Sequence, residues 1–391
     1  MKNLLIALRS LFLVIILAAS VPSINSATVD EVYEVNGISY AVTLSYGDLA
    51  AEVVAGTVPY KGAVKIPKQV TIPGYVKPLG VCRIVECAFE DCTGVTSVSL
   101  PEGLLTIKER AFAGCTKMSS VNIPSTCITM EEDVFLDCAS LTTISLPKGL
   151  RVLGQETGSV DYRIFHGCTL LKSINVASGN EFYSSKNGVL YNHDQTILMR
   201  CPQAISALTI PSTVTDILED ACSDCAKITK VSFPSSIDVL GAEAFRGCTK
   251  LATIEIAQPD PDPDGSYMTQ RFGRYAFADC PAIRSVYLNT LVPPFFEDND
   301  GVFDADVCQK ATLYVPEGTA EAWPQIEGWR LFTKIREQGS SGIESIDADE
   351  AQIAPVEYYD LNGCRVDEAV MGSGMYIRRQ GSKVEKIVIR R

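Results

Sequence analysis

The chain has little of what most catalytic sites need. Its 391 residues include only two histidines and two tryptophans. His166 and His193 belong to no spacing that is typical of a nucleophile–histidine–acid triad or of a zinc site. The sequence also has no phosphate loop and no dinucleotide-binding fingerprint. These absences disfavour hydrolases, zinc enzymes and nucleotide-dependent enzymes, so we expect a non-catalytic protein with no cofactor and no bound metal.

Positive charge is also scarce, and long apolar runs are confined to one place. The formal net charge is −13, which argues against a nucleic-acid partner. The apolar stretch after Met1-Lys2-Asn3 is broken by Arg9-Ser10, is densest over 11–19, and is followed by small residues at 23–27. This order is typical of a secretory signal peptide, which we place at residues 1–26. A membrane anchor is the alternative, but the unbroken run is too short to span comfortably, so we expect no transmembrane segment in the mature chain.

What the sequence does have is a repeated phrase in which phenylalanine stands three residues before cysteine. Six copies of this phrase end at Cys92, Cys115, Cys138, Cys168, Cys248 and Cys280. In a seventh copy, which ends at Cys225, Cys222 takes the place of phenylalanine. The shortest interval between successive cysteines of this phrase is 23 residues, and longer intervals indicate insertions in loops. A fixed internal period of this length predicts stacked repeats.

Three apolar columns follow each cysteine in fixed phase, at the third, sixth and eighth residue after it. The last two columns are two residues apart, which is typical of a strand with alternate side chains inward. A single coil cannot bury its apolar side, whereas stacked coils about 4.8 Å apart form one continuous core. We therefore predict a repeat solenoid, mainly β with short helical or irregular turns. Val98, Val121 and Ile144 are expected to share its core.

The pattern Phe-x-x-Cys-x-x-Leu-x-x-Ile-x-Ile-Pro resembles the BspA-like leucine-rich repeats of bacterial surface and secreted proteins. The resemblance covers about residues 60–337, including an inserted hairpin over 187–198 and a closing cap over 313–332. Two departures are Cys222 and a last copy in which Phe303 precedes Cys308 by five residues. The resemblance implies a leucine-rich repeat solenoid and an adhesin or binder of host matrix proteins, although most members have no assigned activity.

The ends of the chain differ from the repeats. Asn36-Gly37 between two strand-like runs predicts a hairpin, so we expect residues 27–80 to form an N-terminal cap and first coil, with the solenoid and its closing cap over 81–337.

Glycine and serine predict a flexible linker over 338–352. Residues 353–391 are expected to form a small all-β module with a turn at Asn362-Gly363. Its segments 359–366 and 374–377 resemble C-terminal sorting domains of the type IX secretion pathway, which implies outer-membrane export and a removable tail. A small accessory module is the alternative.

An exported chain with 14 cysteines would ordinarily contain disulfides. Seven of the cysteines share one repeat phase, so their side chains point in parallel and not at each other. We expect these seven to form a column of reduced, buried thiols without the basic neighbour that a nucleophile needs. The remaining cysteines, here called off-phase, leave a disulfide open: Cys82, Cys87, Cys127, Cys201, Cys222, Cys308 and Cys364.

One acidic segment matches part of a calcium-binding motif. Asp260 to Gly265 matches the start of an EF-hand loop, but its twelfth position is Arg271, where a bidentate glutamate is required. Two prolines also stiffen this segment. We interpret it as a solvated acidic insert between coils and do not predict a calcium site.

The outward strand positions are the candidate binding face. Seven residues after each repeat cysteine stand Ser99, Asn122, Ser145, Asn175, Ser232, Glu255 and Tyr287. These side chains are mostly small and polar, so they leave a sheet surface accessible and can form hydrogen bonds to a partner. A plain solvated face is the alternative, because binding hot spots favour Trp, Tyr and Arg. We expect an exported, secreted or cell-surface binding protein that contacts a protein or glycan, such as a component of the host extracellular matrix. A structural envelope component without a dedicated ligand is the alternative, and a secreted enzyme is a remote one.

Overall fold

The structure is a computed structural model that describes residues 31–154, 162–259, 269–297, 301–338, 356–359, 365–366, 374–380 and 383–389. Its contacts divide the chain into two units, Met1–Arg336 and Glu337–Arg391. The signal peptide, the linker from residue 339 and the acidic segment 260–265 lie outside the described residues. The division of the chain into five segments stays a prediction.

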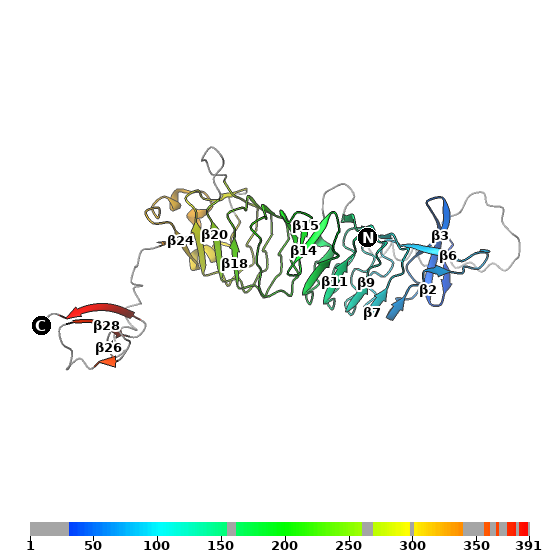
Figure 1. The fold of residues 1–391 in the computed structure, drawn as a ribbon, viewed down its shortest axis with the longest axis horizontal. Coiled ribbons are helices and arrows are strands. Elements are labelled where there is room, and N and C mark those ends of the chain that lie inside the picture. Colours follow the sequence, from blue (N-terminus) through cyan, green and yellow to red (C-terminus); the bar gives the residue numbers. More distant parts are fainter. Residues whose placement is uncertain are drawn as a thin grey trace. The chain divides into compact units, whose positions relative to one another are not determined.

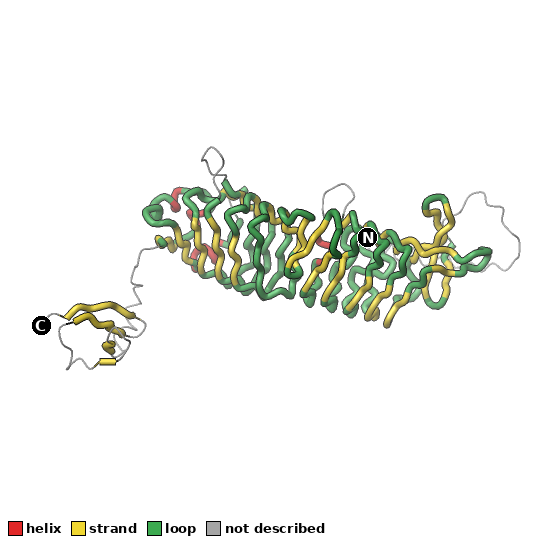
Figure 2. Tube along the Cα trace, in the orientation of Figure 1, coloured by secondary structure: helices red, strands yellow, loops and turns green. Residues whose placement is uncertain are grey.

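In the first unit, successive coils stack one behind another, and the strands form two rows (Figures 1 and 2). The row with longer strands consists of β4 (Lys61–Lys65), β7 (Gly94–Ser99), β9 (Ser120–Asn122), β11 (Thr143–Leu146), β13 (Ser173–Val176), β18 (Lys230–Phe233), β20 (Thr253–Ala257), β22 (Ser285–Asn289), β24 (Thr312–Val315) and β25 (Lys334–Glu337). The second row consists of β6 (Leu79–Ile84), β8 (Thr106–Ile107), β10 (Thr129–Met130), β12 (Val152–Leu153), β17 (Asp216–Ile217), β19 (Val239–Leu240), β21 (Arg271–Phe272) and β23 (Phe295–Phe296). Neighbouring coils pair in parallel, as in β7 with β9 and β8 with β10.

The predicted Asn36-Gly37 turn and the inserted hairpin implied by the resemblance are both present, each with an Asn-Gly turn. The first joins β1 (Tyr33–Val35) to β2 (Ile38–Ser45), which continues into β3 (Asp48–Val53) and through it into the second row. The short strand β5 (Gln69–Val70) also pairs with β6. The second turn joins β14 (Tyr183–Lys186) to β15 (Val189–Asn192), which pairs with β16 (Ile197–Arg200). Both residues of each turn have positive φ, which is the geometry of a type I′ hairpin.

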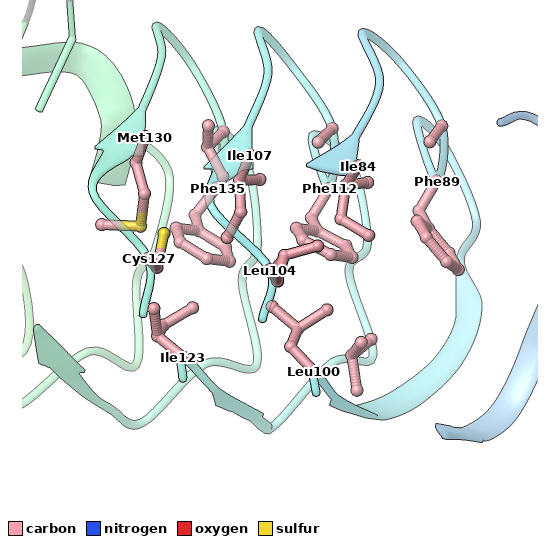
Figure 3. Packing of buried hydrophobic residues seen from close by; sticks show 14 of the residues in the cluster. Ile84, Phe89, Leu100, Leu104, Ile107, Phe112, Ile123, Cys127, Met130 and Phe135 are labelled. Carbon is pink, nitrogen blue, oxygen red and sulfur yellow. The ribbon is translucent and has the colours of Figure 1, made fainter. Parts of the chain in front are cut away.

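The apolar columns point into the space between the two rows (Figure 3). Val98 and Ile144 are buried, and Val121 is partly buried against the same cluster. The predicted shared core is therefore confirmed. The lower burial of Val121 coincides with an interruption of the sheet beside β9, where no ladder joins β9 to β11.

The repeat phenylalanines stack face to face from coil to coil. Ring centroids are 5.0 Å apart for Phe89 and Phe112, 5.7 Å for Phe112 and Phe135, and 5.9 Å for Phe135 and Phe165. Figure 3 shows three of these rings at equivalent places of successive coils. Such pairs add to the free energy of burial by about 0.5–1.5 kcal/mol each. The stack therefore fixes the register of one coil on the next.

The repeat cysteines are buried as predicted, and six of the seven thiols donate a hydrogen bond to a backbone carbonyl. The Sγ of Cys115 donates to the carbonyl of Phe89 at 3.1 Å, and the Sγ of Cys138 donates to that of Phe112 at 3.2 Å. Every cysteine in the described part of the chain is a free thiol. Burial raises the pKa of Cys115 to about 12, so its reactive thiolate is not populated at neutral pH.

Helical turns are short, and the last ones close the solenoid. They are η1 (Tyr162–Phe165), α2 (Ala305–Lys310), η2 (Trp323–Gln325) and η3 (Trp329–Leu331). The indole of Trp329 donates to the carbonyl of Pro294 at 2.9 Å and packs edge-on against Trp323. Both tryptophans are buried, so they cover the apolar end of the last coil. The predicted fold, a mainly β solenoid with short helical turns, is confirmed.

The second unit is a small antiparallel sheet. Its strands are β26 (Val356–Tyr359), β27 (Arg365–Val366), β28 (Gly374–Gln380) and β29 (Lys383–Ile389), in the order β27-β26-β28-β29. The all-β character of this module was predicted, whereas its expected Asn362-Gly363 turn lies outside the described residues.

Candidate binding face

The seven predicted face residues lie on seven successive strands of the longer-stranded row. Ser99, Asn122, Ser145, Asn175 and Ser232 are exposed, whereas Glu255 and Tyr287 are half-buried. Strand register brings neighbours together: Ser99 is opposite Asn122, Ser145 is opposite Asn175, and Glu255 lies between Ser232 and Tyr287. Their outward placement follows from strand alternation, because the columns on either side of them point inward.

These residues do not share one continuous sheet. The row divides into three sheets, β4-β7-β9, β11-β13 and β18-β20-β22-β24-β25. The second division, after β13, coincides with the inserted hairpin, whose Gly188 carbonyl accepts a hydrogen bond from the Ile174 amide at 2.8 Å. The face therefore has an N-terminal part from β7 to β13 and a C-terminal part from β18 onward.

The N-terminal part contains a shallow depression at the interruption between β9 and β11. Its polar lining consists of Ser97, Ser99, Ser120, Asn122 and Ser145, and Val121 contributes apolar surface. None of these lining side chains carries a charge, so hydroxyl and amide groups provide its polarity. Three of them, Ser99, Asn122 and Ser145, are predicted face residues, and Ser97 and Ser120 lie two residues before Ser99 and Asn122 on the same strands.

The C-terminal part is chemically different because it contains an ion pair. Lys230 Nζ lies 2.7 Å from Glu255 Oε1, and the Ser232 hydroxyl donates to Glu255 Oε2 at 2.7 Å. The hydrogen bonds from Lys230 and Ser232 lower the pKa of the Glu255 carboxyl below its ordinary value. Glu255 is therefore already engaged by its neighbours, which makes it a weaker candidate contact than its position alone indicates.

Tyr287 stacks on a residue that sequence analysis did not single out. The rings of Tyr287 and Tyr314 are nearly parallel, with centroids 4.4 Å apart, and the two residues are opposite in the β22–β24 ladder. Tyr314 lies in the segment Leu313-Tyr314-Val315 of the closing cap, which lacks the repeat phrase. The apolar residues Leu313 and Val315 on either side of Tyr314 are the sequence signal that would have placed it on this face, and both are buried.

The remaining candidates for chemistry are scattered. His166 Nε2 lies 4.0 Å from Asp224 Oδ2, and His193 Nδ1 lies 3.0 Å from the Asn180 carbonyl oxygen. Arg271, the residue that spoils the calcium motif, lies 3.5 Å from Asp238. Within the described ranges, no group of His, Cys, Asp and Glu side chains could hold a metal ion. In the same ranges, no helix has the length and apolar character to cross a membrane.

The repeats match a known family over more than half of the chain. The BspA type leucine rich repeat region matches residues 68–186 and 194–295 in six copies. The chain belongs to this family. The match includes the coils that form the depression, and residues 187–193 of the inserted hairpin lie between its two segments. Among curated proteins, no sequence matches the chain.

Several solved bacterial structures are similar to this family member. The pneumococcal vaccine antigen PcpA has 16% identity and a TM-score of 0.44, with 80% of this chain and 100% of that chain covered. A leucine-rich repeat protein from Eubacterium ventriosum has 21% identity and a TM-score of 0.46, with coverage of 73% and 78%. A leucine rich cell surface protein from Faecalibacterium prausnitzii has 19% identity and a TM-score of 0.36, with coverage of 80% and 96%.

Proposed function

We propose that this chain is an exported, non-catalytic binding protein whose N-terminal face, from β7 to β13, contacts a protein or glycan at or beyond the cell surface. One observation carries the proposal. It is the depression beside the interruption between β9 and β11, where five exposed or partly exposed polar side chains gather, four on the paired strands β7 and β9 and one on β11.

The chemistry of this depression favours a ligand that is recognised by hydrogen bonds. Serine hydroxyls both donate and accept, and the Asn122 amide offers two donors and an acceptor. Small side chains also let a ligand approach the backbone of β9 and β11. Because the lining is uncharged, binding is expected to depend little on salt, in contrast to binding through ion pairs.

Export is supported by the order of residues at both ends of the chain. Residues 1–26 have the pattern of a secretory signal peptide. Segments 359–366 and 374–377 of the C-terminal module resemble type IX sorting domains, so we propose that the tail is removed after outer-membrane passage. Membership of a repeat family found on bacterial surfaces is consistent with both.

A screen of the mature full-length chain against glycan and matrix-protein arrays tests the proposed function. We expect saturable binding that Asn122→Arg and Ser145→Arg abolish, because each places a long charged side chain in the depression. Ser212→Arg is the matched control, since Ser212 is an exposed serine in a turn of a different coil. Self-association or envelope retention with no ligand on either array would contradict the proposal and favour a structural component. Turnover of a substrate would favour an enzyme.

A further inference from the structure

The N-terminal cap continues only one of the two rows of strands. Its strands β1, β2 and β3 extend the second row, because β3 pairs with β6. The longer-stranded row begins with β4, which among the described strands pairs with β7 alone. The next strand, β7, is paired on both sides, with β4 and with β9. The sheet that carries Ser99 and Asn122 therefore has an open edge beside the cap.

The open edge of β4 presents backbone groups that are available to another strand. The amide of Ile66 donates to the carbonyl of Ser99 in β7 at 3.0 Å. Successive residues of a strand direct their backbone groups to opposite sides, so those of Lys65 and Ala63 face away from β7. Within the described part of the chain, residues 61–65 form no backbone hydrogen bond outside the ladder to β7. An edge of this kind is a template for an added strand.

A groove with a volume of about 340 Å³, within the range of ligand-binding pockets, lies beside this edge. One wall is β4, the other is the β1–β2 hairpin, and residues 56–60 complete the lining. The Tyr60 hydroxyl donates to the Val54 carbonyl at 2.8 Å and accepts from the Ser39 amide at 3.1 Å. The Tyr60 ring is buried and packs on Phe89, with centroids 4.5 Å apart. These contacts hold the two walls in place, so the groove is present before a ligand binds.

The exposed side of β4 gives the groove a positive charge. Lys61 and Lys65 are exposed, and neither belongs to an ion pair among the described residues. Glu34, on β1, is the one acidic side chain of the lining. Farther along the same row, Lys230 lies 2.7 Å from Glu255 of the neighbouring strand. A carboxylate on a strand added beside β4 is expected to reach a lysine of β4 in the same way.

A second copy of the chain is a poor match for this edge. Two β4 edges brought together would place lysines against lysines, and edge lysines are a common means by which sheets avoid self-association. The last strand of the row, β25, is also cationic on its exposed side, which carries Lys334 and Arg336. Head-to-tail pairing of β25 with β4 would again bring like charges together, which is destabilising. The charges therefore favour a partner strand that carries carboxylates.

We infer that the groove beside β4 binds an extended acidic peptide of a partner protein as an added β-strand. Backbone hydrogen bonds to Ala63 and Lys65 provide affinity, and ion pairs with Lys61 and Lys65 provide the preference for acidic sequences. The inference does not rest on the proposed function, because the groove and the depression between β9 and β11 have no lining residue in common.

The first test is a titration of the full mature chain, followed by fluorescence anisotropy. The probe is a labelled peptide of about six residues, the usual length of a strand, in which glutamate alternates with threonine. One control peptide has glutamine in place of every glutamate. A second is N-methylated at every amide, so it keeps the charge but cannot donate hydrogen bonds to a sheet edge. We expect saturable binding of the probe, about tenfold weaker binding of the glutamine peptide, and no binding of the methylated peptide.

The second test asks which lysines bind the probe. Lys61→Glu/Lys65→Glu should weaken binding by at least about tenfold at about 0.15 M salt. Lys117→Glu/Lys227→Glu is the matched control, because it changes the net charge equally at two exposed lysines of other coils, and it should leave binding unchanged. Circular dichroism checks that both variants fold, and the peptide controls test the inference with the unaltered chain.

Three results would overturn the inference. Equal binding of the methylated peptide and the probe, or equal weakening by the two double variants, would mean that binding follows overall charge. Dimers in light scattering that the probe dissociates would make a second copy the occupant of the edge. Absence of binding by every peptide would also overturn the inference, and it would leave the proposed function unaffected, since the array screen addresses the depression with different ligands.

Discussion

Substituting Gly114 by alanine probes the packing of one coil on the next. Gly114 stands just before a repeat cysteine, in the left-handed region at φ +71°, and an added Cβ would overlap the carboxylate of Asp91 in the preceding coil. The same arrangement recurs where Gly167 meets Asp137 and where Gly247 meets Asp224. Aspartate and glycine thus alternate along one column, and each carboxylate occupies the space that the glycine leaves.

The expected cost has two parts. Left-handed backbone costs an alanine about 1–2 kcal/mol, and forcing an extra carbon into an occupied space adds about 1–3 kcal/mol. Gly114→Ala should therefore lower the free energy of unfolding by about 2–5 kcal/mol. Gly62→Ala is the matched control, because Gly62 has φ +72° with open space around it, and should cost about 1–2 kcal/mol.

Urea unfolding followed by far-UV circular dichroism measures both variants. Asp91→Gly removes the carboxylate and suits the positive φ of that position, so Gly114→Ala in this background should cost no more than the Gly62 control. The reasoning is refuted if Gly114→Ala and Gly62→Ala are equally destabilising, or if Asp91→Gly fails to reduce the cost.

Two further predictions concern the stack and the ion pair. Phe112→Ala removes a fully buried ring between two others and should lower the free energy of unfolding by about 3–5 kcal/mol. Phe182→Ala, at an exposed ring, should change it by well under about 1 kcal/mol. Equal urea midpoints for the two variants would contradict the contribution of the stacked rings to stability. The lowered pKa of Glu255 means that its contribution to stability is present above about pH 4.3 and is lost as the pH falls through the folded-state value. Lys230→Met should make the free energy of unfolding less dependent on pH in that acid range, whereas Lys227→Met, at an exposed lysine, should not. Identical slopes of the free energy of unfolding against pH for the two variants would count against the ion pair of Lys230 with Glu255.

The repeat columns could be predicted from sequence because every coil buries them by the same contacts. The Phe-x-x-Cys phrase and the strand alternation after it recur in fixed phase, so each copy reports on the others. The Asn36-Gly37 hairpin could also be predicted, because its turn geometry depends on two local residues.

The interruptions of the face could not be predicted in this way. Residues 120–123 alternate like those of neighbouring coils, yet β9 ends at Asn122 and does not pair with β11. Strand pairing depends on how two coils meet, which a local pattern does not encode. The chemical difference between the two parts of the face, by contrast, was visible in Lys230, Glu255 and Tyr287.

The place of Cys201 in the stack was also missed. The phrase before it is Met199-Arg200-Cys201, without the apolar residue and phenylalanine that mark other coils. Its distance of 21 residues from Cys222 is close to the repeat period, and this spacing was the available signal. Only the hydrogen bond from its backbone amide to the Ala221 carbonyl, equivalent to that from Phe89 to Ala111, places it in the phenylalanine column.

A crystal structure of the mature chain tests the central claim, that the coils stack in register and turn small polar side chains outward. We predict near-parallel rings of Phe89, Phe112 and Phe135 with centroids 5.0 and 5.7 Å apart, and Asn122 and Ser145 facing solvent. Rings in separate cores, or Asn122 and Ser145 turned inward, would contradict both the fold and the binding face built on it.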